Sequence, residues 1–79
     1  MARDSFVVEL NKQARFAQED WFVIWIPSGG TSKPVTQFRK KQPAIDKARG
    51  LAKHPDNRPS ELVIKDKEGK VSERRRYDN

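Results

Sequence analysis

The sequence predicts an α+β domain in which one helix lies across one face of an antiparallel sheet of four to five strands. Apolar residues recur with helical spacing between Lys41 and Lys53, and the segments on both sides are alternating or continuously apolar. Turn sequences rich in Gly and Pro separate these segments. The predicted element order is β-β-β-α-β-β, in a single domain over residues 1–79.

The first strand is predicted over Ser5–Leu10, where Phe6, Val8 and Leu10 alternate along the segment. The polar segment Asn11–Glu19 follows and is predicted to form either a long hairpin loop or two strand ends with a poorly ordered tip.

The segment Asp20–Ile26 is the strongest predicted strand because every residue after the aspartate is apolar. Alternation places Trp21, Val23 and Trp25 on one face and leaves the other face to Phe22, Ile24 and Ile26. A strand with one buried face alternates apolar with polar residues, so both faces of this strand need cover. One helix covers only one face. We therefore expect the other face to meet the hairpin loop, a tail, a second subunit or a ligand.

A turn is predicted over Pro27–Pro34, which contains two adjacent glycines. Adjacent glycines can cradle a phosphate, but no Gly-Lys-Ser/Thr signature follows and no helix begins there. A structural hairpin loop is therefore predicted, followed by a short third strand over Val35–Phe38.

The helix between Lys41 and Lys53 carries an apolar stripe suited to packing on a sheet. Its members are Ala44, Ile45, Ala48, Leu51 and Ala52. Gly50 interrupts the helix at a cost of about 1 kcal/mol relative to Ala, and close packing against a Trp side chain would explain it. The predicted core consists of Trp21, Val23, Ile45, Ala48, Leu51 and Val63.

Two further strands are predicted after the helix. Ser60–Lys65 is apolar at its centre, and Asp66–Gly69 is a tight-turn sequence with Gly at a position that needs a positive φ. The segment Lys70–Tyr77 then returns as an antiparallel strand. Its alternation sends Arg75 to one face and both Arg74 and Arg76 to the other.

The pattern after Asp20 resembles a known family. It begins with Trp21, Val23, Phe38 and Lys41. The helix contributes Ala44-Ile45, Ala48-Arg49 and Leu51-Ala52-Lys53. It ends with the strand Glu61–Ile64, then Asp66, Gly69-Lys70-Val71 and the closing pair Arg74 and Tyr77. This spacing resembles domain-of-unknown-function family 2188, a group of small prokaryotic proteins, some of them encoded by phages. The family's activity is unassigned, so the resemblance implies no catalytic residue.

The chain departs from that family's pattern at the beginning of the helix. Lys40 stands where such sequences usually have a Thr N-cap, and Pro43 stands where they have an acidic residue. Lysine cannot accept a hydrogen bond from the first-turn N–H groups, and its charge opposes the helix dipole. The basic run Arg39-Lys40-Lys41 therefore lowers helix stability. Either an anion such as a backbone phosphate docks there, or the run is a solvated surface.

The composition favours binding over catalysis. The chain has no Cys, and its only histidine, His54, lies at the end of the helix. Its carboxylates are scattered among Lys and Arg, so we expect a non-enzymatic protein with no catalytic residue, metal site or cofactor. No apolar run is long enough to span a membrane and no signal peptide is evident, so we expect a cytoplasmic protein without a membrane partner.

Two functions from different classes follow. The first is an interaction module that forms a homodimer and binds a protein partner through the uncovered sheet face. Its candidate residues are Phe22, Ile24 and Ile26, or Trp21 and Trp25, whichever set the helix leaves uncovered. The second is weak, sequence-nonspecific nucleic-acid binding, suggested by 17 Lys and Arg against 11 Asp and Glu and a net charge of +6. The candidate residues for the second function are Arg39, Lys40, Lys41, Arg74, Arg75, Arg76 and Tyr77.

Overall fold

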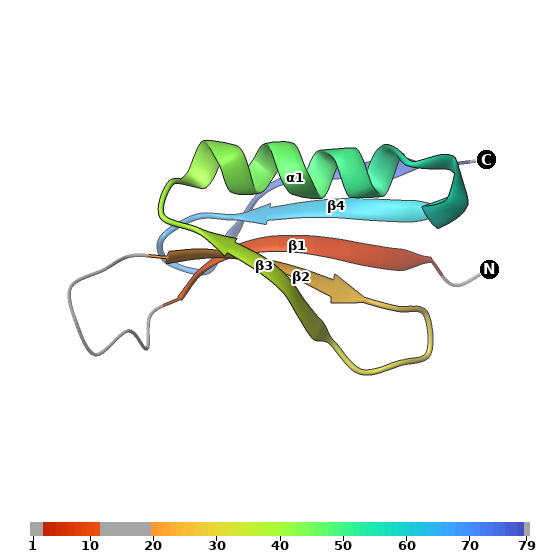
Figure 1. The fold of residues 1–79 in the computed structure, drawn as a ribbon, viewed down its shortest axis with the longest axis horizontal. Coiled ribbons are helices and arrows are strands. Elements are labelled where there is room, and N and C mark those ends of the chain that lie inside the picture. The colour runs from red at the N-terminus through yellow and green to blue at the C-terminus, as the bar shows by residue number, and fades with distance from the viewer. Residues whose placement is uncertain (1–2, 12–19, 79) are drawn as a thin grey trace.

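A computed structural model describes residues 3–11 and 20–78 and shows one helix packed on a five-stranded sheet (Figure 1). The predicted α+β class and element order are confirmed. The predicted loop over Asn11–Glu19 lies almost entirely outside the described residues. The elements are β1 (Asp4–Asn11), β2 (Asp20–Ile26), β3 (Lys33–Phe38), α1 (Lys41–Lys53), the 3₁₀ turn η1 (Pro55–Asn57), β4 (Ser60–Lys65) and β5 (Val71–Tyr77).

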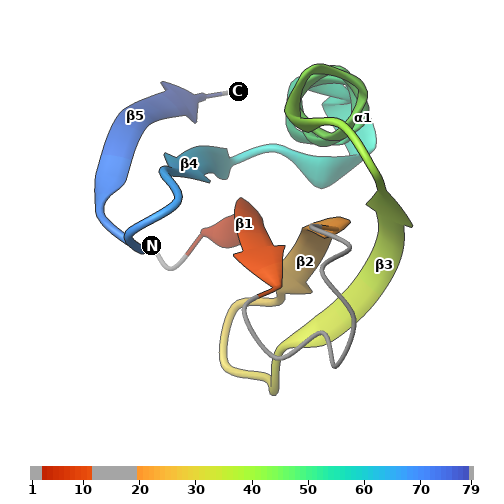
Figure 2. The same ribbon diagram turned by 90° about the vertical axis from the view of Figure 1, so that its left-hand side faces the viewer.

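The sheet has the strand order β3-β2-β1-β4-β5. Three neighbouring pairs are antiparallel as predicted, but β1 and β4 are parallel, with Phe6 opposite Leu62 and Val8 opposite Ile64. Because β3 and β4 both run parallel to β1, α1 is the crossover that carries the chain back over β2 and β1. Figure 2 shows α1 on one side of a curved sheet, with β3 and β5 at its two edges.

The core lies between α1 and the sheet, where three alanines at successive turns of α1 are completely buried. Small side chains let the helix backbone approach the large ring of Trp21, which is itself buried. The buried cluster consists of Phe6, Val8, Trp21, Val23, Ala44, Ala48, Ala52, Leu62 and Ile64.

Three members of the predicted core are not part of this buried cluster. Ile45 and Leu51 are only partly buried at the margin of the cluster. Val63 lies on the opposite face of the sheet, because its parallel pairing with Val7 sets the alternation of β4 so that Leu62 and Ile64 face the helix.

Two glycine predictions have different outcomes. Gly69 has a φ of 85°, which confirms the predicted turn between β4 and β5. Gly50 is exposed, and a Cβ atom built on it would meet nothing within 4 Å. Close packing against a Trp side chain therefore does not explain Gly50, and that expectation was wrong.

The third strand begins at Lys33, two residues before the predicted start, so Pro34 lies within the ladder opposite Ile24. The pairing shifts register between Val23 and Ile24, which leaves Val35 as the extra residue of a β-bulge. Proline and a bulge on an outer strand both weaken its ability to pair with a further strand.

We expect Leu62→Ala to lower the free energy of unfolding by about 2–5 kcal/mol, because Leu62 is completely buried between sheet and helix. Leu51→Ala should cost less, because part of this side chain is already exposed. Val71→Ala is a matched control at an exposed apolar position and should change stability by less than about 0.5 kcal/mol. Urea unfolding of the three variants measures the differences, and equal losses at Leu51 and Leu62 would contradict this description of the core.

Candidate functional site

The sheet face away from α1, called the open face below, carries an apolar patch on β2 and β3. Ile24 pairs with Pro34 of β3 and with Val7 of β1, and Phe22 and Ile26 follow on the same face of β2. Phe22 and Ile24 are half-buried, whereas Ile26 retains 38% of its surface exposed. The structure thus places the Trp side of β2 under the helix and leaves Phe22, Ile24 and Ile26 on the open face. We call Phe22, Ile24, Ile26 and Pro34 the outer apolar patch.

Two valines in the middle of the open face are buried. Val7 and Val63 are only 7% and 6% exposed, although among the described elements α1 lies on the opposite side of the sheet. Arg74 lies directly opposite Val63, and the Lys65–Glu9 and Arg74–Glu61 ion pairs lie on the same face. The expectation that both faces of the sheet need cover is therefore met at these two positions.

Charges on the open face balance one another. Lys65 of β4 pairs with Glu9 of β1 at 3.5 Å, and Arg74 of β5 pairs with Glu61 of β4 at 3.2 Å. Among the described residues, the strands direct three acidic and three basic side chains to this face: Glu9, Asp20, Glu61, Lys65, Arg74 and Arg76. The excess positive charge of the chain is therefore carried elsewhere.

The basic run at the beginning of α1 is only partly free. Lys40 occupies the N-cap without a side-chain cap bond, and the first turn contains no acidic residue. The Lys41 ammonium lies 5.2 Å from the centre of the Trp21 ring, a cation–π contact. Its positive charge also attracts the Asp66 carboxylate in the β4–β5 turn. Arg39 and Lys40 remain exposed.

The second basic run is divided between the two faces of β5. Arg75 lies opposite Leu62 and so faces the helix side, whereas Arg74 and Arg76 lie on the open face, as predicted. Tyr77 packs against the core cluster, and its buried hydroxyl makes no hydrogen bond within the described residues. This packing occupies the ring that base stacking would require.

The two basic runs lie toward opposite ends of α1. Tyr77 pairs with Ser60, whose hydroxyl donates a hydrogen bond to the Ala52 carbonyl near the C-terminus of the helix. Arg39 and Lys40 precede the N-terminus of the same helix. The beginning of the first run and the end of the second therefore lie toward opposite ends of the helix.

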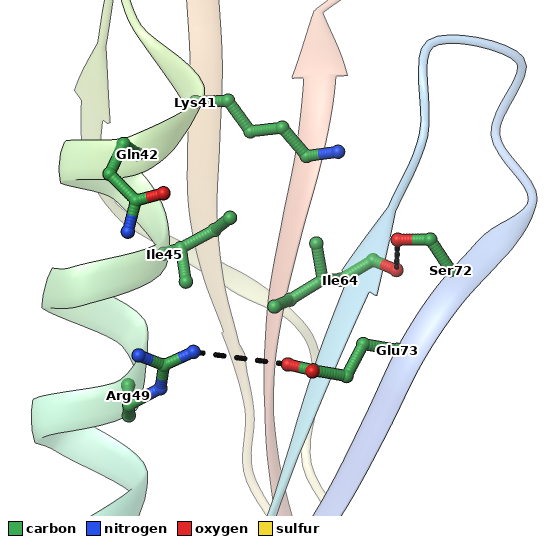
Figure 3. Close-up of a pocket in the computed structure, with 7 residues that line it drawn as sticks. All are labelled: Lys41, Gln42, Ile45, Arg49, Ile64, Ser72 and Glu73. Atoms are coloured by element: carbon green, nitrogen blue, oxygen red, sulfur yellow. Dashed lines mark hydrogen bonds and ion pairs between the residues drawn. The ribbon is translucent and has the colours of Figure 1, made fainter.

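A groove between α1 and β5 was not predicted from the sequence (Figure 3). Ile45 and Ile64 form its apolar floor, with Lys41 above them. Arg49 and Glu73 approach each other across it at 3.9 Å. The groove has a volume of about 300 Å³. It exists because α1 packs over β1, β2 and β4 and stops short of β5. No local sequence signal marks it, since its two walls come from segments more than twenty residues apart.

His54 has a structural role at the end of α1. Its Nδ1 accepts a hydrogen bond from the Asp56 N–H at 3.1 Å and so caps η1. Within residues 3–11 and 20–78, no group of three or more His, Cys, Asp or Glu side chains is arranged to hold a metal ion. In the same part of the chain, no helix is long and apolar enough to cross a membrane.

Comparison with known proteins agrees with the resemblance seen in the sequence. The family model described as "Uncharacterized protein conserved in bacteria (DUF2188)" matches residues 17–77, which include every element from β2 to β5. No curated protein and no solved structure matches the chain.

The hydrogen bonds to the Asp66 carboxylate predict how the stability of the fold depends on pH. It accepts hydrogen bonds from the backbone N–H groups of Lys70 and Glu68 at 3.0 and 2.9 Å, and these bonds, the Lys70 one first, lower the pKa of Asp66 below its ordinary 3.8. A carboxyl with a depressed folded-state pKa stabilises the fold above its unfolded pKa, and this contribution is lost as pH falls through the folded pKa. In the Asp66→Asn variant, the free energy of unfolding should therefore fall less steeply as the pH is lowered.

Urea unfolding at a series of pH values below about 5 measures this effect. Asp46→Asn, at an exposed position of α1, is the control with the same change of charge. If the free energy of unfolding depends on pH in the same way in the wild type and in Asp66→Asn, the lowered pKa of Asp66 is contradicted.

Proposed function

This chain belongs to the DUF2188 family of uncharacterized proteins conserved in bacteria, and we propose that it is a non-enzymatic interaction module that self-associates through the outer apolar patch. The observation that carries the proposal is the contiguity of Phe22, Ile24, Ile26 and Pro34 on the face opposite the only described helix. Neighbouring apolar side chains on one surface mark interaction sites more often than isolated ones do. A shallow hollow beside the patch, lined by Phe22, Pro34 and Gln37, offers space for an inserted side chain.

A second copy of the chain is the partner that the charge distribution favours. The chain carries a net charge of +6, so two copies repel each other over most orientations. On the open face, however, the described acidic and basic side chains are equal in number. Two ion pairs, Lys65–Glu9 and Arg74–Glu61, already form among them. A twofold dimer through this face brings neutral apolar surfaces together and keeps the charged surfaces apart.

Self-association also suits a chain of 79 residues, because a domain of this size buries only about 60% of the surface that its unfolded chain exposes. Burying the outer apolar patch adds to a small core built largely from one layer of side chains. A protein partner of another kind that presents a neutral apolar surface would use the same patch.

We expect sedimentation at micromolar concentration to give twice the monomer mass of 9.2 kDa. Placing two ammonium groups in the interface with Ile24→Lys/Ile26→Lys should give the monomer mass, because a charge buried without a partner disfavours association strongly. Val71→Lys is the matched control, since Val71 is exposed and apolar but lies on the opposite edge strand. A monomeric wild-type protein, or a double variant that still dimerises, would contradict the proposal.

Weak nucleic-acid binding is the second candidate function. Arg39 and Lys40 support it, because both are exposed beside a helix N-terminus that has no side-chain cap and no acidic residue in its first turn. Backbone phosphates are suitable ligands for such a position. Sequence preference is not expected, since the basic residues of α1 form no evident base-reading pattern.

The expected signature is a steep dependence on salt. Log affinity for duplex DNA should fall with log salt at a slope of about −0.9 for each phosphate contact. Arg39→Ala/Lys40→Ala should reduce this slope and the affinity, whereas Lys47→Ala/Lys53→Ala on the exposed side of α1 should change both less. Fluorescence anisotropy with short labelled oligonucleotides at low salt is the measurement. If the two double variants lose equal affinity for DNA, the interaction depends on net charge alone and not on the position of Arg39 and Lys40.

A further inference from the structure

The two edges of the sheet differ in their capacity to pair with another strand. On β3, Pro34 has no N–H to donate and the register shifts beside it. On β5 there is no proline, and the only register shift lies at its beginning, between Ile64 and Lys65 of its partner strand. From Glu73 to Tyr77 the pairing with β4 is regular, so the outer side of β5 offers an uninterrupted row of backbone donors and acceptors.

The edge offered by β5 carries cations on both of its faces. Arg75 projects to the helix side, and Arg74 and Arg76 project to the open face. Arg74 is held by Glu61, but within the described residues no ion pair engages Arg75 or Arg76. The three arginines and the two residues before them are exposed, so a partner can reach this stretch of β5 from outside.

This arrangement suits an in-plane strand better than a polyanion lying on one face of the sheet. A polyanion on the open face reaches Arg74 and Arg76 but not Arg75, and one on the helix side reaches only Arg75. A strand added beside β5 directs successive side chains to both faces, about 4.5–5.5 Å from the residues directly opposite. Consecutive acidic residues on such a strand therefore meet consecutive arginines.

We propose that the outer edge of β5 binds an extended acidic segment of another protein by strand addition. Main-chain hydrogen bonds to β5 supply the pairing, and carboxylates opposite Arg74, Arg75 and Arg76 supply the selection for acidic sequence. A second copy of the chain is a poorer occupant of this edge, because registers that pair two copies of this run bring arginines opposite one another. The inference is independent of self-association through the outer apolar patch, which lies on β2 and β3.

The test is a titration of the uniformly ¹⁵N-labelled full chain, followed by NMR. The probe is a seven-residue peptide with three consecutive glutamates at its centre, flanked by valine and threonine residues. Amide shifts should concentrate in β5, and outward-pointing amides there should exchange more slowly with solvent. The matched probe has the same sequence with alternate backbone nitrogens methylated. Methylation keeps the charge of the peptide but removes the N–H groups that would donate hydrogen bonds to β5. It should bind at least about tenfold more weakly, because strand addition depends on those hydrogen bonds.

A pair of protein variants separates local from overall charge. Arg75→Glu/Arg76→Glu keeps both residues of the Arg74–Glu61 pair and places like charges opposite the peptide. Lys47→Glu/Lys53→Glu makes the same change of net charge on exposed positions of α1. The β5 variant should weaken binding by about tenfold more than the α1 variant. Circular dichroism checks that both variants remain folded, and the single variant Arg75→Glu should show the same direction of effect.

Three outcomes would overturn the proposal. One is equal binding of the methylated and unmethylated peptides, which would make the contact purely electrostatic. Another is equal weakening by the two charge-reversal variants. The third is that a short single-stranded oligonucleotide shifts the β5 amides as strongly as the acidic peptide, which would identify β5 as a nucleic-acid surface. Repeating the titration with Ile24→Lys/Ile26→Lys should give an unchanged result, so failure of self-association and failure of strand addition are distinguishable.

Discussion

The close approach of α1 to the sheet is the constraint on which the rest of this structure depends. Ala44, Ala48 and Ala52 are completely buried at successive turns, and Trp21 fills the space beneath the beginning of the helix. Larger side chains at the alanine positions would lift the helix from the sheet and open voids, which protein interiors rarely tolerate. With no cysteine in the chain, this layer of packing is the main source of stability.

That packing also decides which surfaces remain available for binding. As the crossover between β3 and β4, α1 packs mainly over β1, β2 and β4 and leaves the opposite face of the sheet and the outer edges of β3 and β5 free of helix. Proline and a bulge make the β3 edge less able to pair with another strand, and Val7 and Val63 in the middle of the open face are buried. The outer apolar patch and the outer edge of β5 remain, and they are the surfaces to which we assign binding.

The outer apolar patch and the outer edge of β5 differ in the charge that surrounds them. The open face is balanced within the described residues, whereas the outer edge of β5 presents Arg75 and Arg76 without a described ion-pair partner. A neutral apolar surface suits a like-charged second copy, and a cationic edge suits an acidic strand. One small domain can therefore hold two contacts at once, because the surfaces lie on different strands.

Local sequence patterns determined the element order, the helix bounds and the division of β5 into two arginine faces, because periodicity and turn residues act over a few positions. Tertiary structure alone decided that β4 lies parallel beside β1, since pairing between strands fifty residues apart leaves no local trace. That register moved Val63 out of the core and left Phe22, Ile24 and Ile26 on the open face. The groove between Arg49 and Glu73 has the same origin: it exists only because the helix stops short of β5.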